Sequence, residues 1–151
     1  MKYNKIVLHV DDDRAILKIV QRTLDNHGIQ VVSIQDPLKA ISAIAELGVR
    51  VVLLDIDMPG KDGITLLNEI KRFDAGIQVI MCTGMVSIGT VLQTTSLGAE
   101  ACIFKPIHDL SEITTAVDRA FQKIDQWWIA LHDWKDRRET NKAIKTKVLS
   151  S

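Results

Sequence analysis

Four short apolar runs in this sequence each end in side chains that can do chemistry. The residues at these ends are Asp11 with Asp12, then Asp55, Thr83 and Lys105. Carboxylates brought within a few ångströms repel one another, so either one takes a proton or a cation joins them. Hard oxygen ligands at a half-open edge favour Mg²⁺, which keeps several waters and leaves room for a phosphate oxygen. With an ammonium and a hydroxyl beside them, these groups indicate a site for a phosphoryl group, with Asp55 as the nucleophile.

The apolar pattern predicts the elements that must position these residues. Strands are expected at residues 6–10, 31–34, 51–54, 77–82 and 101–104. Segments with helical spacing follow them, at residues 15–24, 36–47, 64–73 and 86–97 and from about Asp109. Asp36 before Pro37 is a typical helix start, and Gly48 a typical end. Five strands that alternate with helices predict a parallel sheet covered on both faces, because parallel strands need helical crossovers.

The carboxyl ends of parallel strands all lie at one edge of the sheet. The second strand ends at Gln35-Asp36, which we assign to the helix cap. In the doubly wound strand order 2-1-3-4-5 the other four strands are neighbours, and their chemical ends converge. The predicted fold is therefore a flavodoxin-like doubly wound (βα)5 domain of class α/β, with a five-stranded parallel sheet.

Composition sets limits on the class of protein. A chain of 151 residues is long enough for one domain with a core, and 46% hydrophobic with 25% charged residues is typical of a globular protein. A net charge of zero gives no reason to expect nucleic acid or a membrane as partner. Cys82 and Cys102 lie in apolar runs without metal-ligand spacing. We expect them to be buried free thiols in a reducing cytoplasm.

These motifs resemble the receiver domain of bacterial two-component response regulators, including the chemotaxis type. The matching segments lie between about Lys5 and Ile124: Val10-Asp11-Asp12, Leu54 to Gly60 with Asp62-Gly63, Met81 to Gly84, Gly98 to Ala101, and Phe104-Lys105-Pro106. One segment alone would be weak evidence. Their order and spacing together are specific.

The resemblance implies a role for each chemical residue. Asp55 corresponds to the phosphoacceptor, Thr83 to the switch hydroxyl and Lys105 to the phosphate-pairing lysine. Family members usually hold the bond between this lysine and the following proline in cis. The sequence departs from the family at Cys102, where a rotating Tyr or Phe is common. The resemblance therefore implies a switch without its usual aromatic ring.

The resemblance also implies a metal site. Asp11 and Asp12 correspond to the acidic pair that holds Mg²⁺, with Mn²⁺ as a substitute and Asp12 as the expected direct ligand. Asp55 would share the ion. Asp57 falls where the family uses a main-chain carbonyl as a further ligand, and its side chain would lie near the phosphoryl group.

A receiver domain implies signalling partners and no turnover of an external substrate. A sensor histidine kinase or phosphotransfer protein would supply the phosphoryl group, and a downstream effector would read the changed surface. We expect the fourth helix to be the moving part. Its stretch, residues 85–96, contains Gly89 and several Thr and Ser residues, so its helix propensity is poor.

Two alternatives follow from the same residues. Asp55-Ile56-Asp57 resembles the nucleophile motif of haloacid-dehalogenase-type phosphatases, but the second acidic pair of those enzymes follows the nucleophile, whereas Asp11-Asp12 precede it. Met58-Pro59 also stands where that family needs Thr or Val. A receiver-like interaction module that no longer accepts phosphate should lack site residues, and this chain has all of them.

The resemblance ends near Ile124, which divides the chain into a receiver domain at residues 1–125 and a helical extension or linker at 126–151. Apolar residues at alternating spacings of four and three predict that the last helix runs on: Val117, Phe121, Ile124, Trp128 and Leu131. We expect Val117 to Ile124 to pack on the sheet. Later residues would contact a downstream partner or a second subunit, and the alternative homodimer face is the fourth helix with the fifth strand. From Lys135 the chain is basic and is expected to be solvated or disordered.

Overall fold

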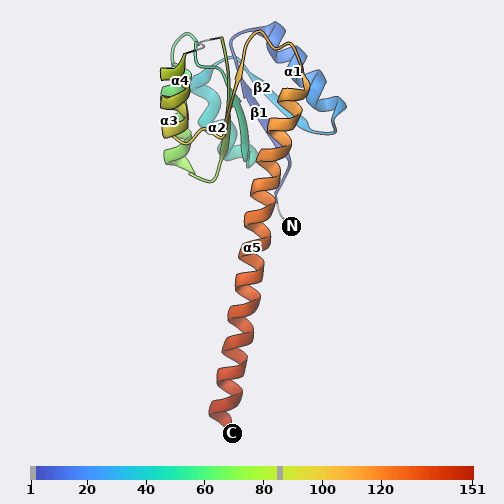
Figure 1. The fold of residues 1–151 in the computed structure, drawn as a ribbon, viewed down its shortest axis with the longest axis vertical. Helices are drawn as coiled ribbons and strands as arrows, with labels where there is room; N and C mark the ends of the chain where they lie inside the picture. The colour runs from blue at the N-terminus through green and yellow to red at the C-terminus, as the bar shows by residue number, and fades with distance from the viewer. Residues whose placement is uncertain (1–2, 85–86) are drawn as a thin grey trace.

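A five-stranded parallel sheet forms the centre of the protein (Figure 1). The structure is a computed structural model, and it describes residues 3–84 and 87–151. The strands are β1 (Ile6–Val10), β2 (Gln30–Ile34), β3 (Val51–Leu54), β4 (Gln78–Thr83) and β5 (Ala101–Phe104). Their order is β2-β1-β3-β4-β5, and every neighbouring pair is parallel. The predicted doubly wound fold and its strand order are therefore confirmed.

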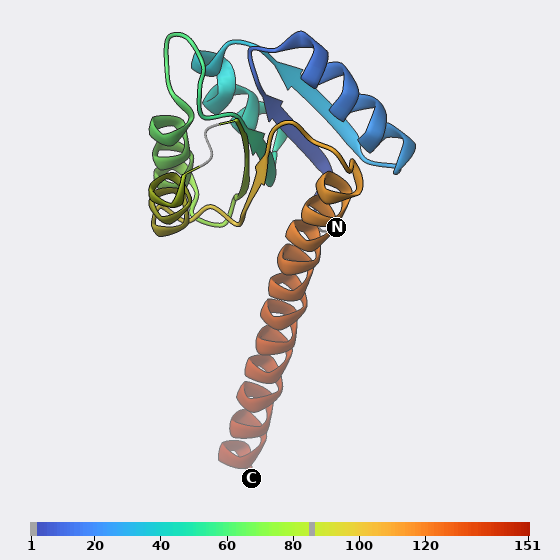
Figure 2. The ribbon, with the colours of Figure 1, turned by 45° about the horizontal axis from the view of Figure 1, so that its top comes forward.

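Helices cover both faces of this sheet (Figure 2). They are α1 (Arg14–Asn26), α2 (Ala40–Leu47), α3 (Gly63–Phe73), α4 (Ile88–Ser96) and α5 (Ser111–Ser150). Alternate side chains of each strand point to opposite faces, so the sheet has a hydrophobic cluster on each side. One cluster contains residues of α2 and α3, and the other contains residues of α1 and α5. Both views place α4 on the side of α3.

Polar side chains set where the helices begin. Asp36 accepts a hydrogen bond from the Leu38 amide, as expected of a cap, but Pro37–Lys39 form a 3₁₀ turn before α2. The last helix begins at Ser111, close to the expected start near Asp109, and the Asp109 carboxylate accepts the Ser111 amide at 2.9 Å. The expected start of the fourth helix at Val86 lies outside the described residues, and α4 begins at Ile88.

Helix α5 is 40 residues long and projects far beyond the sheet (Figures 1 and 2). Its buried residues are Ile113, Val117, Ala120, Phe121 and Ile124. The prediction that Val117 to Ile124 pack on the sheet is therefore confirmed, as is the continuation of the helix. The basic run from Lys135 is helical and exposed to solvent, in agreement with the solvated alternative.

The cysteines differ in their surroundings. Cys82, on the inner strand β4, is buried and free. Cys102 is also free but only half-buried, because β5 is the edge strand of the sheet. The expectation of buried free thiols therefore holds for Cys82, whereas Cys102 is free but only partly buried. Within the described residues, we find no helix whose length and apolar character would let it cross a membrane.

Candidate functional site

Three carboxylates meet at the carboxyl edge of the sheet. Asp11 follows β1 and Asp55 follows β3, and these strands are neighbours. The Asp55 amide donates to the Val10 carbonyl at 3.0 Å, which extends the strand pairing into the site. Carboxylate oxygens of Asp11, Asp12 and Asp55 all lie within 4.8 Å of one another. Asp11 and Asp55 are buried and Asp12 is exposed, so the cluster is open on one side.

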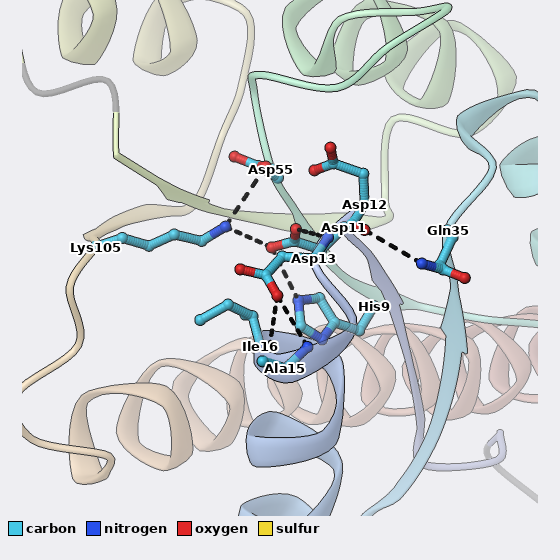
Figure 3. A network of polar contacts seen from close by, with 9 residues as sticks. All are labelled: His9, Asp11, Asp12, Asp13, Ala15, Ile16, Gln35, Asp55 and Lys105. Atoms are coloured by element: carbon cyan, nitrogen blue, oxygen red, sulfur yellow. Dashed lines mark hydrogen bonds and ion pairs between the residues drawn. The ribbon is translucent and has the colours of Figure 1, made fainter.

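Lys105, the residue directly after β5, joins this cluster (Figure 3). Its Nζ lies 2.5 Å from Asp11 Oδ2 and 3.5 Å from Asp55 Oδ2. Burial lowers the pKa of the ammonium, but its hydrogen bond to Asp11 and the charges of both carboxylates outweigh burial and leave the pKa raised. Lys105 is therefore a fixed cation that sits closer to Asp11 than to Asp55.

The carboxylate of Asp55 is in surroundings that disfavour its charge. Burial is the largest cause and raises its pKa, Lys105 lowers it, and the neighbouring charge of Asp11 raises it again. The net effect is a raised pKa. A divalent cation would supply further positive charge and so stabilise the ionised form of Asp55. The donor set of three carboxylates, one of them exposed, fits a hard cation that keeps part of its water.

The loop after Asp55 is tightly closed. The Gly63 amide donates to the Ile56 carbonyl at 2.8 Å. A Cβ on Gly63 would lie 1.9 Å from the Asp55 carbonyl oxygen, so only glycine fits there. Asp62 then caps α3 by accepting from the Thr65 amide. These contacts fix the backbone that carries the candidate nucleophile.

An open hollow of about 500 Å³ gives access to the cluster. Its lining residues are Asp11, Asp12, Asp13, Asp55, Asp57, Gly84 and Lys105. Five of the six residues predicted for the site are in this lining. Thr83, at the end of β4, is instead fully buried, and its neighbour Gly84 lines the hollow. The Lys105-Pro106 bond is cis.

Sequence reasoning missed several residues around the cluster. The Asp13 amide donates to Asp11 Oδ1 at 2.9 Å, and the Asp13 side chain caps α1. Gln35, assigned to a helix cap, donates to the Asp12 carbonyl at 3.2 Å. His9 lies within β1, and its Nε2 is 3.9 Å from Asp11 Oδ2 (Figure 3). Strand alternation could have indicated this neighbour, since residues two apart share a face.

Comparison with known proteins identifies the family. The model of the response regulator receiver domain matches residues 7–118. The chain belongs to this family of receiver domains. It is 31% identical over 116 residues to sporulation initiation phosphotransferase F of Bacillus subtilis, across 77% of this chain and 93% of that protein. It is 35% identical over 103 residues to the chemotaxis protein CheY of Bacillus subtilis, across 68% of this chain and 86% of that protein.

A solved structure shows the same architecture. The CheY-like receiver domain protein from Methanospirillum hungatei superimposes with a TM-score of 0.76 and 26% identity. The match covers 82% of this chain and 98% of the other. The receiver domain thus accounts for the sheet, its helices and the first part of α5, whereas the family match stops at residue 118, within that helix.

Proposed function

We propose that this receiver domain accepts a phosphoryl group on Asp55 from a sensor histidine kinase or a phosphotransfer protein. The changed surface then controls a downstream effector, and the domain turns over no other substrate. One observation carries the proposal: Asp55 is a buried carboxylate with a raised pKa, beside a lysine and two further carboxylates at an open hollow. The proposed location is the cytoplasm, where free thiols stay reduced.

The residues that would hold Mg²⁺, or Mn²⁺ in its place, are Asp11, Asp12 and Asp55 with the main-chain carbonyl of Asp57. The bound ion would supply positive charge against the carboxylates and the phosphoryl oxygens. Asp55 attacks the phosphorus in line, so a new P–O bond forms as the P–N bond of the phosphohistidine donor breaks. The Lys105 ammonium, 3.5 Å from Asp55, neutralises charge on the transferred group.

The switch starts from Thr83, at the end of β4. Its hydroxyl turns to the phosphoryl group, and the movement is transmitted to α4. The Thr, Ser and Gly residues of α4 have low helix propensity, so this helix is easily displaced. Cys102 is small and half-buried, so it fills less space than the aromatic ring common in the family. We therefore propose that α4 moves in this protein without a coupled ring rotation.

The proposed second partner is another copy of this chain, bound through α5. Trp127, Leu131 and Trp134 repeat at spacings of four and three and are 45%, 44% and 54% exposed. An isolated helix that projects into water is marginally stable, and packing of an apolar stripe against a partner is the usual remedy. Ile88 and Leu92 of α4 and Phe104 of β5 also expose apolar surface, and this face is the alternative dimer interface.

The deciding experiment is intact mass spectrometry after incubation with a small phosphodonor and Mg²⁺. We expect one added phosphoryl group on the parent, dependent on Mg²⁺ and absent from Asp55→Asn. Asp57→Asn is the matched control, because it removes an exposed carboxylate from the same loop and keeps the main-chain carbonyl. An unmodified parent at saturating Mg²⁺ would leave a constitutive interaction module as the better description.

A further inference from the structure

His9 is a buried histidine that the proposed chemistry does not use. It lies on β1 two residues before Asp11, and its side chain is fully buried. Neither ring nitrogen has a hydrogen-bond partner. Buried polar atoms are nearly always paired in folded proteins, because an unpaired one loses its bonds to water and gains none. An unpaired imidazole beside a functional carboxylate therefore calls for an explanation.

A second unpaired atom lies on the neighbouring strand. Ser33 on β2 is the register partner of His9, so their side chains lie on the same face of the sheet. The Ser33 hydroxyl oxygen is also buried without a partner. An imidazole ring can donate a hydrogen bond from one nitrogen and accept one at the other, which matches a carboxylate on one side and a hydroxyl on the other.

One oxygen of the Asp11 carboxylate lies near the ring nitrogen of His9. Asp11 Oδ1 accepts the Asp13 amide at 2.9 Å, and Asp11 Oδ2 accepts Lys105 at 2.5 Å. His9 Nε2 lies 3.9 Å from the same Oδ2, about 1 Å beyond an ordinary hydrogen bond. Lys105 is also the cation nearest Asp55 in this cluster, at 3.5 Å. A phosphoryl group on Asp55 would draw Lys105 away from Asp11, so Oδ2 would lose this hydrogen-bond donor even where a cation is bound at the cluster.

We propose that His9 is a positioning residue that takes over Asp11 Oδ2 when Lys105 moves to a phosphoryl group on Asp55. In that form the Ser33 hydroxyl, unpaired in the resting structure, donates to the opposite ring nitrogen and holds the tautomer that donates from Nε2. The inference rests on the proposed function. Its consequence is that Asp11 keeps its orientation in the phosphorylated form. The unpaired nitrogens of the resting form gain partners there, which favours the phosphorylated state.

The test uses beryllofluoride, a stable mimic of the phosphoryl group, with Mg²⁺ on the full chain. Calorimetry measures its affinity for the parent, His9→Leu and His9→Gln. We expect His9→Leu to weaken binding about tenfold, the effect of one hydrogen bond to a charged group. Glutamine keeps a side-chain donor and should restore most of the affinity. Without ligand, His9→Leu should unfold at an equal or higher urea concentration than the parent, because leucine leaves no unpaired nitrogen.

The outcomes separate the inference from the proposed function. A parent that does not bind beryllofluoride overturns the proposed function, and this inference with it. If the parent binds beryllofluoride no better than His9→Leu does, the inference alone is overturned. It is also overturned if His9→Leu loses both affinity and ligand-free stability and His9→Gln does not restore the affinity. A second measurement uses the parent alone and so does not depend on the folding of the leucine variant. NMR of the parent should show that the His9 Nε2 proton becomes hydrogen-bonded when beryllofluoride and Mg²⁺ are added. An unchanged proton overturns the inference.

Discussion

At the scale of single residues, the Asp55 carboxylate links the stability of the fold to pH. Its pKa is raised, mainly by burial, and Lys105 offsets only part of this effect. The folded state therefore holds the Asp55 proton more tightly than the unfolded chain does. The stabilisation from this proton is complete below the unfolded pKa and is lost as the pH rises through the folded pKa. At neutral pH the ionised Asp55 thus lowers the free energy of unfolding.

Asp55→Asn should therefore stabilise the protein in the absence of Mg²⁺. We expect the free energy of unfolding at pH 7 to rise by about 1 kcal/mol, an ordinary size for one substitution. The gain should shrink as the pH falls towards 4, because the parent carboxyl then takes up its proton. Urea unfolding at several pH values measures both effects. A gain that is independent of pH, or equal in Asp57→Asn, would contradict the assignment to the Asp55 charge.

Prediction from sequence succeeded for residues placed by the backbone alone. Asp11, Asp12, Asp55 and Lys105 meet because each follows a parallel strand, and strand order decides which ends are neighbours. His9 could not be assigned in this way. Its distance from Asp11 depends on side-chain direction, which the sequence does not give. That its ring nitrogens lack hydrogen-bond partners can be seen only when the positions of all neighbouring polar groups are known.

At the scale of elements, the connection from β3 to α3 holds the backbone of Asp55, the proposed nucleophile. Gly63 is the first residue of α3, and an added Cβ would lie 1.9 Å from the Asp55 carbonyl oxygen. Gly63→Ala should lower the free energy of unfolding by about 3 kcal/mol, because backbone must move to admit the methyl group. It should also reduce phosphorylation of Asp55. Urea unfolding and intact mass measure the two effects.

The matched control is the same substitution in α4. Gly89 has ordinary helical surroundings, with only Ser87 Oγ at 3.9 Å from an added Cβ. Gly89→Ala should therefore raise the free energy of unfolding by about 0.5–1 kcal/mol, because alanine loses less backbone entropy in a helix. If both variants changed stability in the same direction, the close approach of Gly63 to Asp55 would not be the cause.

Element order could be predicted from the alternation of apolar patterns, but element ends could not. The ends depend on local turns and single hydrogen bonds, such as that from the Ser111 amide to Asp109 where α5 begins. Pro37 gave a 3₁₀ turn where one continuous helix was expected, although the Asp36 cap itself was predicted. Local chemistry identifies a boundary, and its position shifts with the geometry of the neighbouring turn.

At the scale of the whole molecule, α5 divides into a part that belongs to the domain and a part that leaves it. Ile124 is buried in the cluster of α1 and α5, and Trp128 packs at its edge. Trp134 lies beyond the sheet, with the Arg138 guanidinium over its ring at 5.3 Å. The spacing of apolar residues predicted a continuous helix, but spacing alone does not say what covers the outer part.

The proposed dimer through α5 is tested by substitutions on two faces of this helix. Leu131 lies in the stripe with Trp127 and Trp134, whereas Ile144, 54% exposed, lies on another face of the helix. We expect the parent to be dimeric at tens of micromolar in sedimentation equilibrium, Leu131→Asp to be monomeric, and Ile144→Asp to remain dimeric. Arg138, the next position of the stripe, is charged, so pairing should end near Trp134. A monomeric parent, or equal dissociation by both variants, would contradict this interface.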